Sequence, residues 1–399
     1  MNRNANSFPI FSQRKIIKSK INNFAQTILR PVITRNQIFA KVCRASLLPE
    51  LPDFHGFSFF YEYTYPEINP PLFYIDDEIN RDFSRSFQPP NQEAKYQSGI
   101  ILASDVYASF PHPIHKWKDK VFIEGLRESL KPLTEPRYLL ALASIPFAKK
   151  QNLKSGILLA MPYHNNYYHW MVEMLPRLQM IEGDEKFKDI PIIMPKNRTP
   201  KFVYESIKLT GFLDRTLFLD DGVYHFDHLY IPSLLSLIKQ PSPLAIEWLS
   251  KKLVTNNQIN NKRRIYVSRR DALRRSITNE PEVEQMLSEF GFETVCLRDH
   301  SLEEQVKIFQ EAEFVIGSHG AGFSNIAFTP AQSILIELFQ EGRFSPTFYR
   351  LAGIKNVKYG FLVCKKDGIG QYVNVNQLKE LVEKAVANIN GRNIYSNPI

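Results

Sequence analysis

The sequence is poor in cysteine and lacks any long apolar run. Its 399 residues include 3 cysteines, Cys43, Cys296 and Cys364, which are far apart and do not have metal-ligand spacing. An odd set of separated cysteines is typical of a reducing compartment and excludes a disulfide scaffold. No apolar run reaches the roughly 18 residues that a membrane-spanning helix requires, and residues 1–30 lack the apolar core of a signal peptide. We therefore expect a soluble, cytoplasmic protein.

Acidic residues are missing from the N-terminal segment, which carries all of the excess positive charge. The chain has 50 Lys+Arg and 41 Asp+Glu, and residues 1–49 hold the surplus without a single acid. The rest of the chain is neutral, which argues against a nucleic-acid-binding face on the folded domains. In residues 11–30, apolar positions recur at helical spacing beside basic ones. This pattern predicts a helix that either lies on an anionic membrane surface or packs on the body; a transit peptide is disfavoured because serine is sparse.

The spacing of apolar runs differs between an early and a later part of the chain. Residues 32–148 are irregular, with proline clusters and many aromatics, whereas short apolar runs alternate with helical patterns from residue 155 onward. Such alternation predicts a parallel sheet covered by helices. The predicted elements include a strand at 216–219 and helices at 168–181, 321–328 and 376–389. A proline-containing connection at 232–243 separates two α/β sets, so we expect two Rossmann-like domains with a cleft between them. The predicted units are a basic N-terminal segment, two α/β domains and a C-terminal helix with its tail: 1–49, 50–240, 241–375 and 376–399.

A glycine-rich turn follows an apolar strand at residues 315–325. Gly317, Gly320 and Gly322 would let backbone N–H groups approach an anion, and the helix that begins there adds further free N–H groups. His319 lies at the mouth of the turn and could donate a hydrogen bond to a phosphate. The alternative is a tight turn that needs glycine only for its shape, but the histidine favours an anion site. The spacing matches neither G-x-G-x-x-G nor a P-loop, which disfavours a hydride-transfer dehydrogenase.

Arginines cluster just upstream, at 264–275. Arg269 would emerge past the carboxyl end of a parallel strand, where open α/β sheets bind ligands, and a guanidinium there can clamp a diphosphate. We expect most of the other arginines, including Arg270, Arg274 and Arg275, to be solvated.

A second candidate segment, 163–177, opens the helix after the first strand. His169 and Glu173 are four residues apart and share one helix face, so either is a candidate general base. The alternative is that Glu173 pairs with Arg177 and that the helix only packs. A metal site that adds His164 is disfavoured because the spacing is not a known zinc pattern.

Several blocks in this order resemble the family 61 glycosyltransferases: YHWMVEMLPRL, RRIYVSRR, GFETV, LEEQVKIFQEAEFVIGSHGAGFSN and IELF, which together cover about residues 156–339. The resemblance implies a GT-B fold, in which the domain at 50–240 faces the acceptor and the domain at 241–375 binds the nucleotide-sugar. It implies an inverting, metal-independent transfer, with no cofactor and a uridine nucleotide as the first candidate. It also implies a glycan or lipid-linked glycan acceptor, as in bacterial members that build capsular polysaccharide at the inner face of the membrane. No Asp-x-Asp, the metal-diphosphate signature of the other large glycosyltransferase fold, occurs in the chain.

The same resemblance assigns roles. It makes Glu173 the base, with His169 beside it, Arg269 the partner of the leaving phosphate, and Glu337 a carboxylate that faces the ribose hydroxyls. A non-catalytic carbohydrate- or partner-binding protein on the same fold is the alternative. The remaining residues that the resemblance places beside the diphosphate and nucleoside are Ser318, His319, Gly320, Ala321, Gly322 and Asn325.

Overall fold

The computed structural model describes residues 41–44, 53–126, 131–237, 239–254, 262–272 and 274–389. The basic helix predicted at residues 11–30 lies outside these residues.

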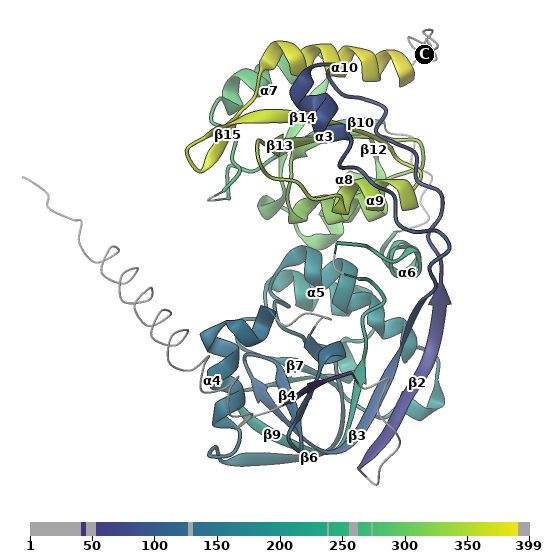
Figure 1. Ribbon diagram of the computed structural model, residues 1–399, viewed down its shortest axis with the longest axis vertical. Coiled ribbons are helices and arrows are strands. Elements are labelled where there is room, and N and C mark those ends of the chain that lie inside the picture. The colour runs from purple at the N-terminus through teal and green to yellow at the C-terminus, as the bar shows by residue number, and fades with distance from the viewer. Residues whose placement is uncertain are drawn as a thin grey trace, which may run out of the picture.

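The described chain forms two α/β lobes, one above the other in Figure 1, each built on one sheet. This arrangement confirms the expected GT-B-like α/β class, in which two domains face each other. The strands of the N-terminal sheet are β1 (Lys41–Cys43), β2 (Phe54–Tyr63), β3 (Tyr96–Phe110), β4 (Ile114–Trp117), β5 (Lys120–Phe122), β6 (Lys150–Leu158), β7 (Ile192–Pro195), β8 (Thr216–Leu219) and β9 (Gly222–Pro232). Those of the C-terminal sheet are β10 (Arg263–Ser268), β11 (Phe292–Cys296), β12 (Ala312–Ser318), β13 (Ile334–Gln340), β14 (Lys358–Asp367) and β15 (Gly370–Tyr372).

The C-terminal sheet is a doubly wound parallel sheet. Its order is β11-β10-β12-β13-β14-β15, and only the last pair is antiparallel. The chain runs from β10 to β11 on one side and then crosses to β12 on the other, so the strand order reverses between β10 and β12. Open α/β sheets bind ligands outside the carboxyl ends of the strands at such a point.

Helices cover both faces of this sheet. Side chains of α7 (Glu280–Ser288) and α10 (Val375–Ile389) belong to one buried apolar cluster with the sheet. Side chains of α8 (Leu302–Gln310), η10 (Ala321–Phe328) and α9 (Thr347–Ile354) belong to another. The helix predicted at 376–389 is therefore α10, packed within the C-terminal lobe.

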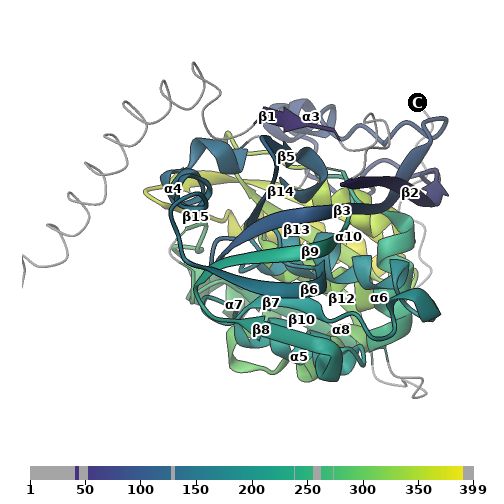
Figure 2. The same ribbon diagram turned by 90° about the horizontal axis from the view of Figure 1, so that it is seen from below.

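The N-terminal sheet is mixed rather than uniformly parallel. β9, β6, β7 and β8 are parallel neighbours, as the α/β rhythm predicts, whereas β3 pairs antiparallel with β2, β4 and β9. Figure 2 shows β3, β9, β6, β7 and β8 side by side. Antiparallel neighbours need only a short turn, while parallel neighbours need a crossover, so the irregular stretch before residue 148 supplies the antiparallel half.

The first helix of this lobe departs from the expected α-helix at 168–181. It is a π-helical turn, η5 (His169–Met174), followed by a 3-10 segment, η6 (Leu175–Met180). Pro176 has no N–H and cannot take part in a regular ladder of helical hydrogen bonds. The other helices of the lobe are α4 (Pro136–Ser144) and α5 (Lys201–Leu209).

The chain crosses to the C-terminal lobe and back between β2 and β3. Phe73 forms a parallel bridge with Gly360 of β14, and α3 (Glu78–Ser84) lies beside this strand in Figure 1. The side-chain oxygen of Asn80 accepts a hydrogen bond from the Val363 N–H at 3.0 Å. This segment thus belongs in space to the lobe that follows it in sequence, although the domain prediction placed it in 50–240.

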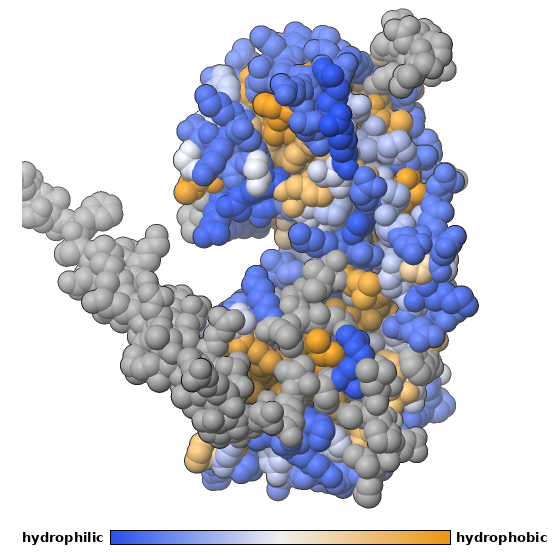
Figure 3. Space-filling model, viewed as in Figure 1, coloured by the Kyte–Doolittle hydropathy of each residue, from blue (hydrophilic) through white to orange (hydrophobic). Residues whose placement is uncertain are grey.

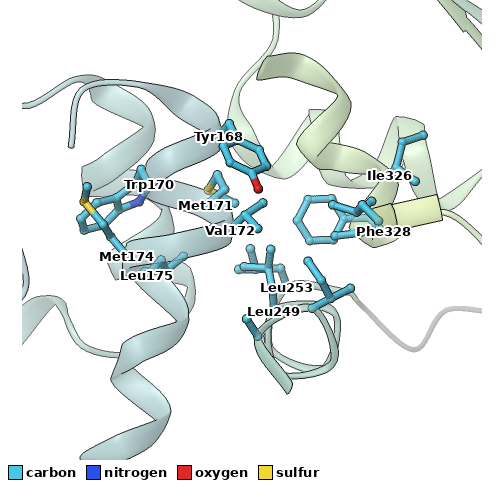
Figure 4. Packing of buried hydrophobic residues seen from close by; sticks show 14 of the residues in the cluster. Tyr168, Trp170, Met171, Val172, Met174, Leu175, Leu249, Leu253, Ile326 and Phe328 are labelled. Carbon is cyan, nitrogen blue, oxygen red and sulfur yellow. The ribbon is translucent and has the colours of Figure 1, made fainter. Parts of the chain in front are cut away.

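An apolar seam joins the lobes. Helix α6 (Pro243–Leu253) lies between η5 and η10, and Figure 4 shows Leu249 and Leu253 facing Val172 and Phe328. All four side chains belong to one buried cluster that extends through both lobes. The lobes therefore share a core and do not simply touch at their surfaces.

Candidate active site

A cavity of about 380 Å³ lies between the lobes. Figure 3 shows the molecule hollowed between its upper and lower parts. The lining includes both of the histidines proposed from the sequence and three cationic side chains. The lining residues are Lys131, Tyr163, Asn166, Tyr168, His169, Glu173, Lys239, Arg275, His319, Gly320, Ala321, Ser345, Thr347 and Phe348.

Much of the cavity is built by segments that follow parallel strands. The chain leaves β6 and reaches Tyr163 and then η5, while β10 and β12 lead to Arg275 and His319. Because the carboxyl ends of neighbouring parallel strands share one edge, residues distant in sequence converge on a single space.

A histidine and a carboxylate meet on the N-terminal side. His169 Nδ1 lies 3.0 Å from Glu173 Oε2, and Glu173 is only 1% exposed although it lines the cavity. The nearby Arg177 directs its hydrogen bonds to the backbone carbonyls of Met174, Pro232 and Leu159. Burial lowers the pKa of Arg177, and the charge of Glu173 opposes that shift. Glu173 thus faces the cavity together with His169.

Trp170 and His164 are structural. Trp170 is fully buried and donates to Ser206 Oγ at 2.7 Å, as the packing alternative expects. His164 is buried, and burial lowers its pKa to about 4. It lies outside the lining of the cavity, so the described residues do not bring the three residues of the metal alternative together there.

Tyr163 lines the cavity in a strained conformation that the sequence did not reveal. Its φ is 68°, a left-handed value uncommon for an aromatic residue. Its N–H donates to Tyr138 Oη at 3.0 Å, and its hydroxyl donates to Glu135 Oε1 at 2.5 Å. These contacts hold the ring beside His169, with 6.1 Å between the ring centroids. Strain of this kind concentrates at functional sites.

On the C-terminal side, His319 is held from behind. Its Nδ1 is hydrogen-bonded to Glu337 Oε1, and the Tyr359 hydroxyl donates to Glu337 Oε2 at 2.6 Å. Glu337 is 0% exposed and is absent from the cavity lining, so the structure places it behind His319 and not on the wall of the cavity. The family resemblance assigned Glu337 to the site, but only the pairing of β13 with β12 shows which group it contacts.

Arg269 lies where strand β10 ends, against the glycine turn. Its guanidinium occupies the position that a Cβ atom on Gly320 would take. Arg269 lines a small neighbouring recess of about 90 Å³ together with Ser318, Gly320 and Gly322. Its Nε is buried without a hydrogen-bond partner among the described residues, and burial lowers its pKa. A half-buried cation with an unused donor is suited to an anionic ligand.

Arg275 lines the main cavity, although the sequence suggested a solvated position. Burial lowers its pKa, and the positive charges of Arg269 and Arg343 lower it further. Its φ of 62° redirects the chain, and its carbonyl accepts from Ser318 Oγ at 2.8 Å. The motif identified the arginine cluster but could not show which side chain turns inward. Lys131 and Lys239 lie in segments without a motif.

Asn325 occupies a structural position. It is fully buried, its side-chain oxygen accepts from Tyr167 at 2.5 Å, and its amide group donates to Gln305 Oε1 at 3.1 Å. Because Tyr167 belongs to the N-terminal lobe, this chain of hydrogen bonds crosses between the lobes. Asn325 therefore orders the seam and does not line the cavity.

The turn presents the start of a helix to the cavity. Gly320 is the N-cap of η10, and Gly320 and Ala321 both line the cavity. The first N–H groups of a helix have no partners within it and carry partial positive charge. With His319 and Arg275 beside them, they make this wall suited to an anion.

Within the described ranges, no helix is both long and apolar enough to cross a bilayer. The same residues contain no group of three or more His, Cys, Asp or Glu side chains arranged to hold a metal ion.

The cleft between two α/β domains and the match to a family of sugar-transferring enzymes define the class of protein, a glycosyltransferase. Residues 167–336 match the family described as Glycosyltransferase 61, and this match supports a family 61 glycosyltransferase. The matched range contains His169, Glu173, Arg269 and the glycine turn, and ends beside Glu337.

Among solved structures, the chain is similar to E. coli heptosyltransferase WaaC with ADP at 12% sequence identity, over 59% of this chain and 98% of that chain, with a TM-score of 0.30. No curated protein matches the sequence.

Proposed function

We propose that this glycosyltransferase moves a sugar from a nucleotide-sugar to a hydroxyl group in a single displacement with inversion and without a metal ion. The observation that carries the proposal is that one cavity has a His–carboxylate pair on one wall and a cationic turn on the other. The first wall suits an acceptor hydroxyl, and the second suits a departing diphosphate.

The two walls divide the chemistry. Glu173 or His169 takes the proton of the acceptor hydroxyl as that oxygen attacks the anomeric carbon. The bond from that carbon to the phosphate oxygen breaks on the opposite face. Negative charge then grows on the phosphate, where His319, Arg275 and the N–H groups of the turn are already oriented. Arg269 adds a cation beside the same turn. These groups fill the role that a divalent cation has in other transferases.

The donor and acceptor follow from the family. A uridine diphosphate sugar is the first candidate donor, and a glycan or lipid-linked glycan of a surface polysaccharide is the candidate acceptor. A cytoplasmic enzyme held at the inner face of the membrane would suit a lipid-linked acceptor, and the basic residues 11–30 are the proposed contact. Deleting residues 1–30 should weaken binding to anionic vesicles; unchanged binding would leave the packed-helix alternative.

The test of the chemistry is Glu173→Gln. The variant should keep nucleotide affinity and lose transfer by roughly 10²–10⁴-fold, the usual contribution of general base catalysis. Substrate consumption with a panel of nucleotide-sugars measures transfer, and a thermal-shift panel of nucleotides measures binding. Glu185→Gln is the matched control, because Glu185 is an exposed acid of the same lobe.

The outcomes separate the alternatives. Near-normal turnover of Glu173→Gln would remove Glu173 from the base role and leave His169. Stabilisation by nucleotide-sugars without any transfer or hydrolysis would favour a binding protein on the same fold. A rate that falls on treatment with a chelator would contradict a metal-independent reaction.

A further inference from the structure

A chain of three side chains runs from the core of the C-terminal lobe to the cavity. Tyr359, Glu337 and His319 lie on or directly after the neighbouring strands β14, β13 and β12. Tyr359 and Glu337 are buried, and His319 is the member that lines the cavity. Each contact in the chain is a hydrogen bond between side chains.

The hydrogen bonds of Glu337 with Tyr359 and with His319 indicate which group donates in each pair. The Tyr359 hydroxyl donates to Glu337 Oε2, and burial together with the charge of Glu337 raises the pKa of this hydroxyl well above its usual value. An ionised Glu337 only accepts hydrogen bonds, and in that state His319 donates from Nδ1 to Oε1. Nε2 is then the ring nitrogen that remains for a ligand.

Aromatic packing fixes the plane of the imidazole. The His319 ring stacks on Phe339 with centroids 5.4 Å apart and an interplanar angle of 23°. Phe348 contacts it from another direction at 5.3 Å. A ring held at one nitrogen and packed against two aromatic rings has little freedom to turn.

The two histidine pairs of the cavity differ in one respect. Glu173 lines the cavity and can touch a substrate directly, whereas Glu337 is enclosed by its partners and does not line it. Glu337 can therefore affect the reaction only through its hydrogen bond to His319 or through the electrostatic effect of its charge on nearby groups. The nearby charged group is Arg275, which Arg269 and Arg343 also influence. The other titratable groups that line the cavity are Lys131, Lys239, His169 and Glu173.

We propose that Glu337 and Tyr359 are positioning residues for His319: they keep Nδ1–H directed into the core and Nε2–H directed at the departing phosphate. This inference rests on the proposed function. As the acceptor oxygen bonds to the anomeric carbon, the bond to the phosphate oxygen breaks and its electron pair stays on that oxygen. The imidazolium, with both nitrogens protonated and its charge balanced by Glu337, donates a hydrogen bond to this oxygen, while the acceptor proton goes to the His169–Glu173 pair.

The test is a double-mutant cycle of Glu337→Gln and His319→Ala, read as kcat and as KM for the donor. His319→Ala should lower kcat by about 10²–10³-fold, as loss of one oriented donor does. Glu337→Gln alone should lower kcat by about 10-fold or more with little change in donor KM. In the His319→Ala background, Glu337→Gln should cost less than about 3-fold, because residues that act as a unit are not additive.

Tyr359→Phe is a second test, because it removes the hydroxyl that donates to Glu337 but keeps the aromatic packing and the carboxylate. It should lower kcat less than Glu337→Gln does and should also have little effect without His319. Tyr349→Phe is the matched control, because Tyr349 is a buried neighbour of Tyr359 with 5.4 Å between the ring centroids. Thermal unfolding shows whether each variant folds. If Glu337→Gln does not fold, Tyr359→Phe replaces it in the double-mutant cycle with His319→Ala.

Two results would overturn the inference. Losses that multiply in the double variant would show that Glu337 acts independently of His319. A rise in donor KM with unchanged kcat in Glu337→Gln would show a direct contact with the donor. Either result would leave turnover by the unmodified enzyme intact, whereas absence of transfer by that enzyme would overturn the proposed function instead.

Discussion

At the scale of single residues, Gly320 shows why the turn needs glycine. Its φ of −175° is extended and open to any residue, so conformation is not the reason. The reason is space, because the Arg269 guanidinium lies where a side chain on Gly320 would begin. The sequence indicated a glycine-rich anion site, but it could not show that one glycine accommodates the arginine predicted independently from another segment.

Gly320→Ala should therefore displace Arg269 and weaken nucleotide binding by roughly 10–100-fold, the value of one charge-assisted hydrogen bond. Calorimetric titration with the nucleoside diphosphate measures the effect. Arg269→Ala should cause a similar loss, and combining the two should add little. Gly222→Ala is the control, because a Cβ there meets nothing closer than 3.5 Å. Wild-type affinity in Gly320→Ala would contradict the assignment.

The predictability of the site differs from residue to residue. His169, Glu173 and His319 could be placed at the cavity because helical spacing and the end of a strand are local features. Asn325 and Glu337 lie in the expected segments, but long-range contacts turn their side chains to the seam and to the back of His319. Local patterns give the segment, whereas packing between strands decides which way a side chain faces.

At the scale of elements, the chain after residue 155 follows its sequence closely, whereas the chain before residue 148 does not. The helix at 321–328 and the strand at 216–219 have the predicted bounds. Clean alternation of apolar runs and helical patterns makes such elements readable. The strands before residue 148 were not predicted in order, because their pairing partners include β9, far along the chain.

At the scale of elements, we predict that helix α6 stabilises the seam between the two lobes. Leu249 is fully buried in the seam between η5 and η10. Leu249→Ala should lower the free energy of unfolding by about 2–5 kcal/mol, because it leaves a cavity in a shared core. Chemical denaturation measures it.

Leu140→Ala is the matched substitution for this experiment, because Leu140 is 51% exposed on α4. It should change the free energy of unfolding by no more than about 0.5 kcal/mol. Equal effects of the two substitutions would contradict a seam that stabilises both lobes.

At the scale of the whole molecule, the crossing segment ties the two lobes together in addition to the seam. Asn80 is 2% exposed, and its side chain accepts the N–H of Val363 at a position that an ordinary strand neighbour would fill. Phe73 and Phe87 pack against β14 of the same lobe, which includes Gly360 and Phe361.

Asn80→Ala should lower the free energy of unfolding by about 1–3 kcal/mol, because it leaves a buried N–H without a partner. Asn80→Asp keeps the acceptor but should not recover this loss, because the Asn80 amide group donates to Asp77 Oδ1 at 2.8 Å and a carboxylate there would repel Asp77. Asn91→Ala, at an exposed position, is the control. Urea denaturation compares the three variants, and a loss confined to the N-terminal lobe would contradict the placement of the segment.

The crossing also sets an order of events during synthesis. The segment with Phe73 and Phe87 leaves the ribosome long before β14, the strand on which both residues pack, has been made. Domains usually fold one after another as the chain emerges, but here the second lobe needs a piece from within the first. These early aromatic residues lack their partner strand until β14 has been made. We therefore expect the nascent chain to depend on chaperones more than its two-lobed shape suggests.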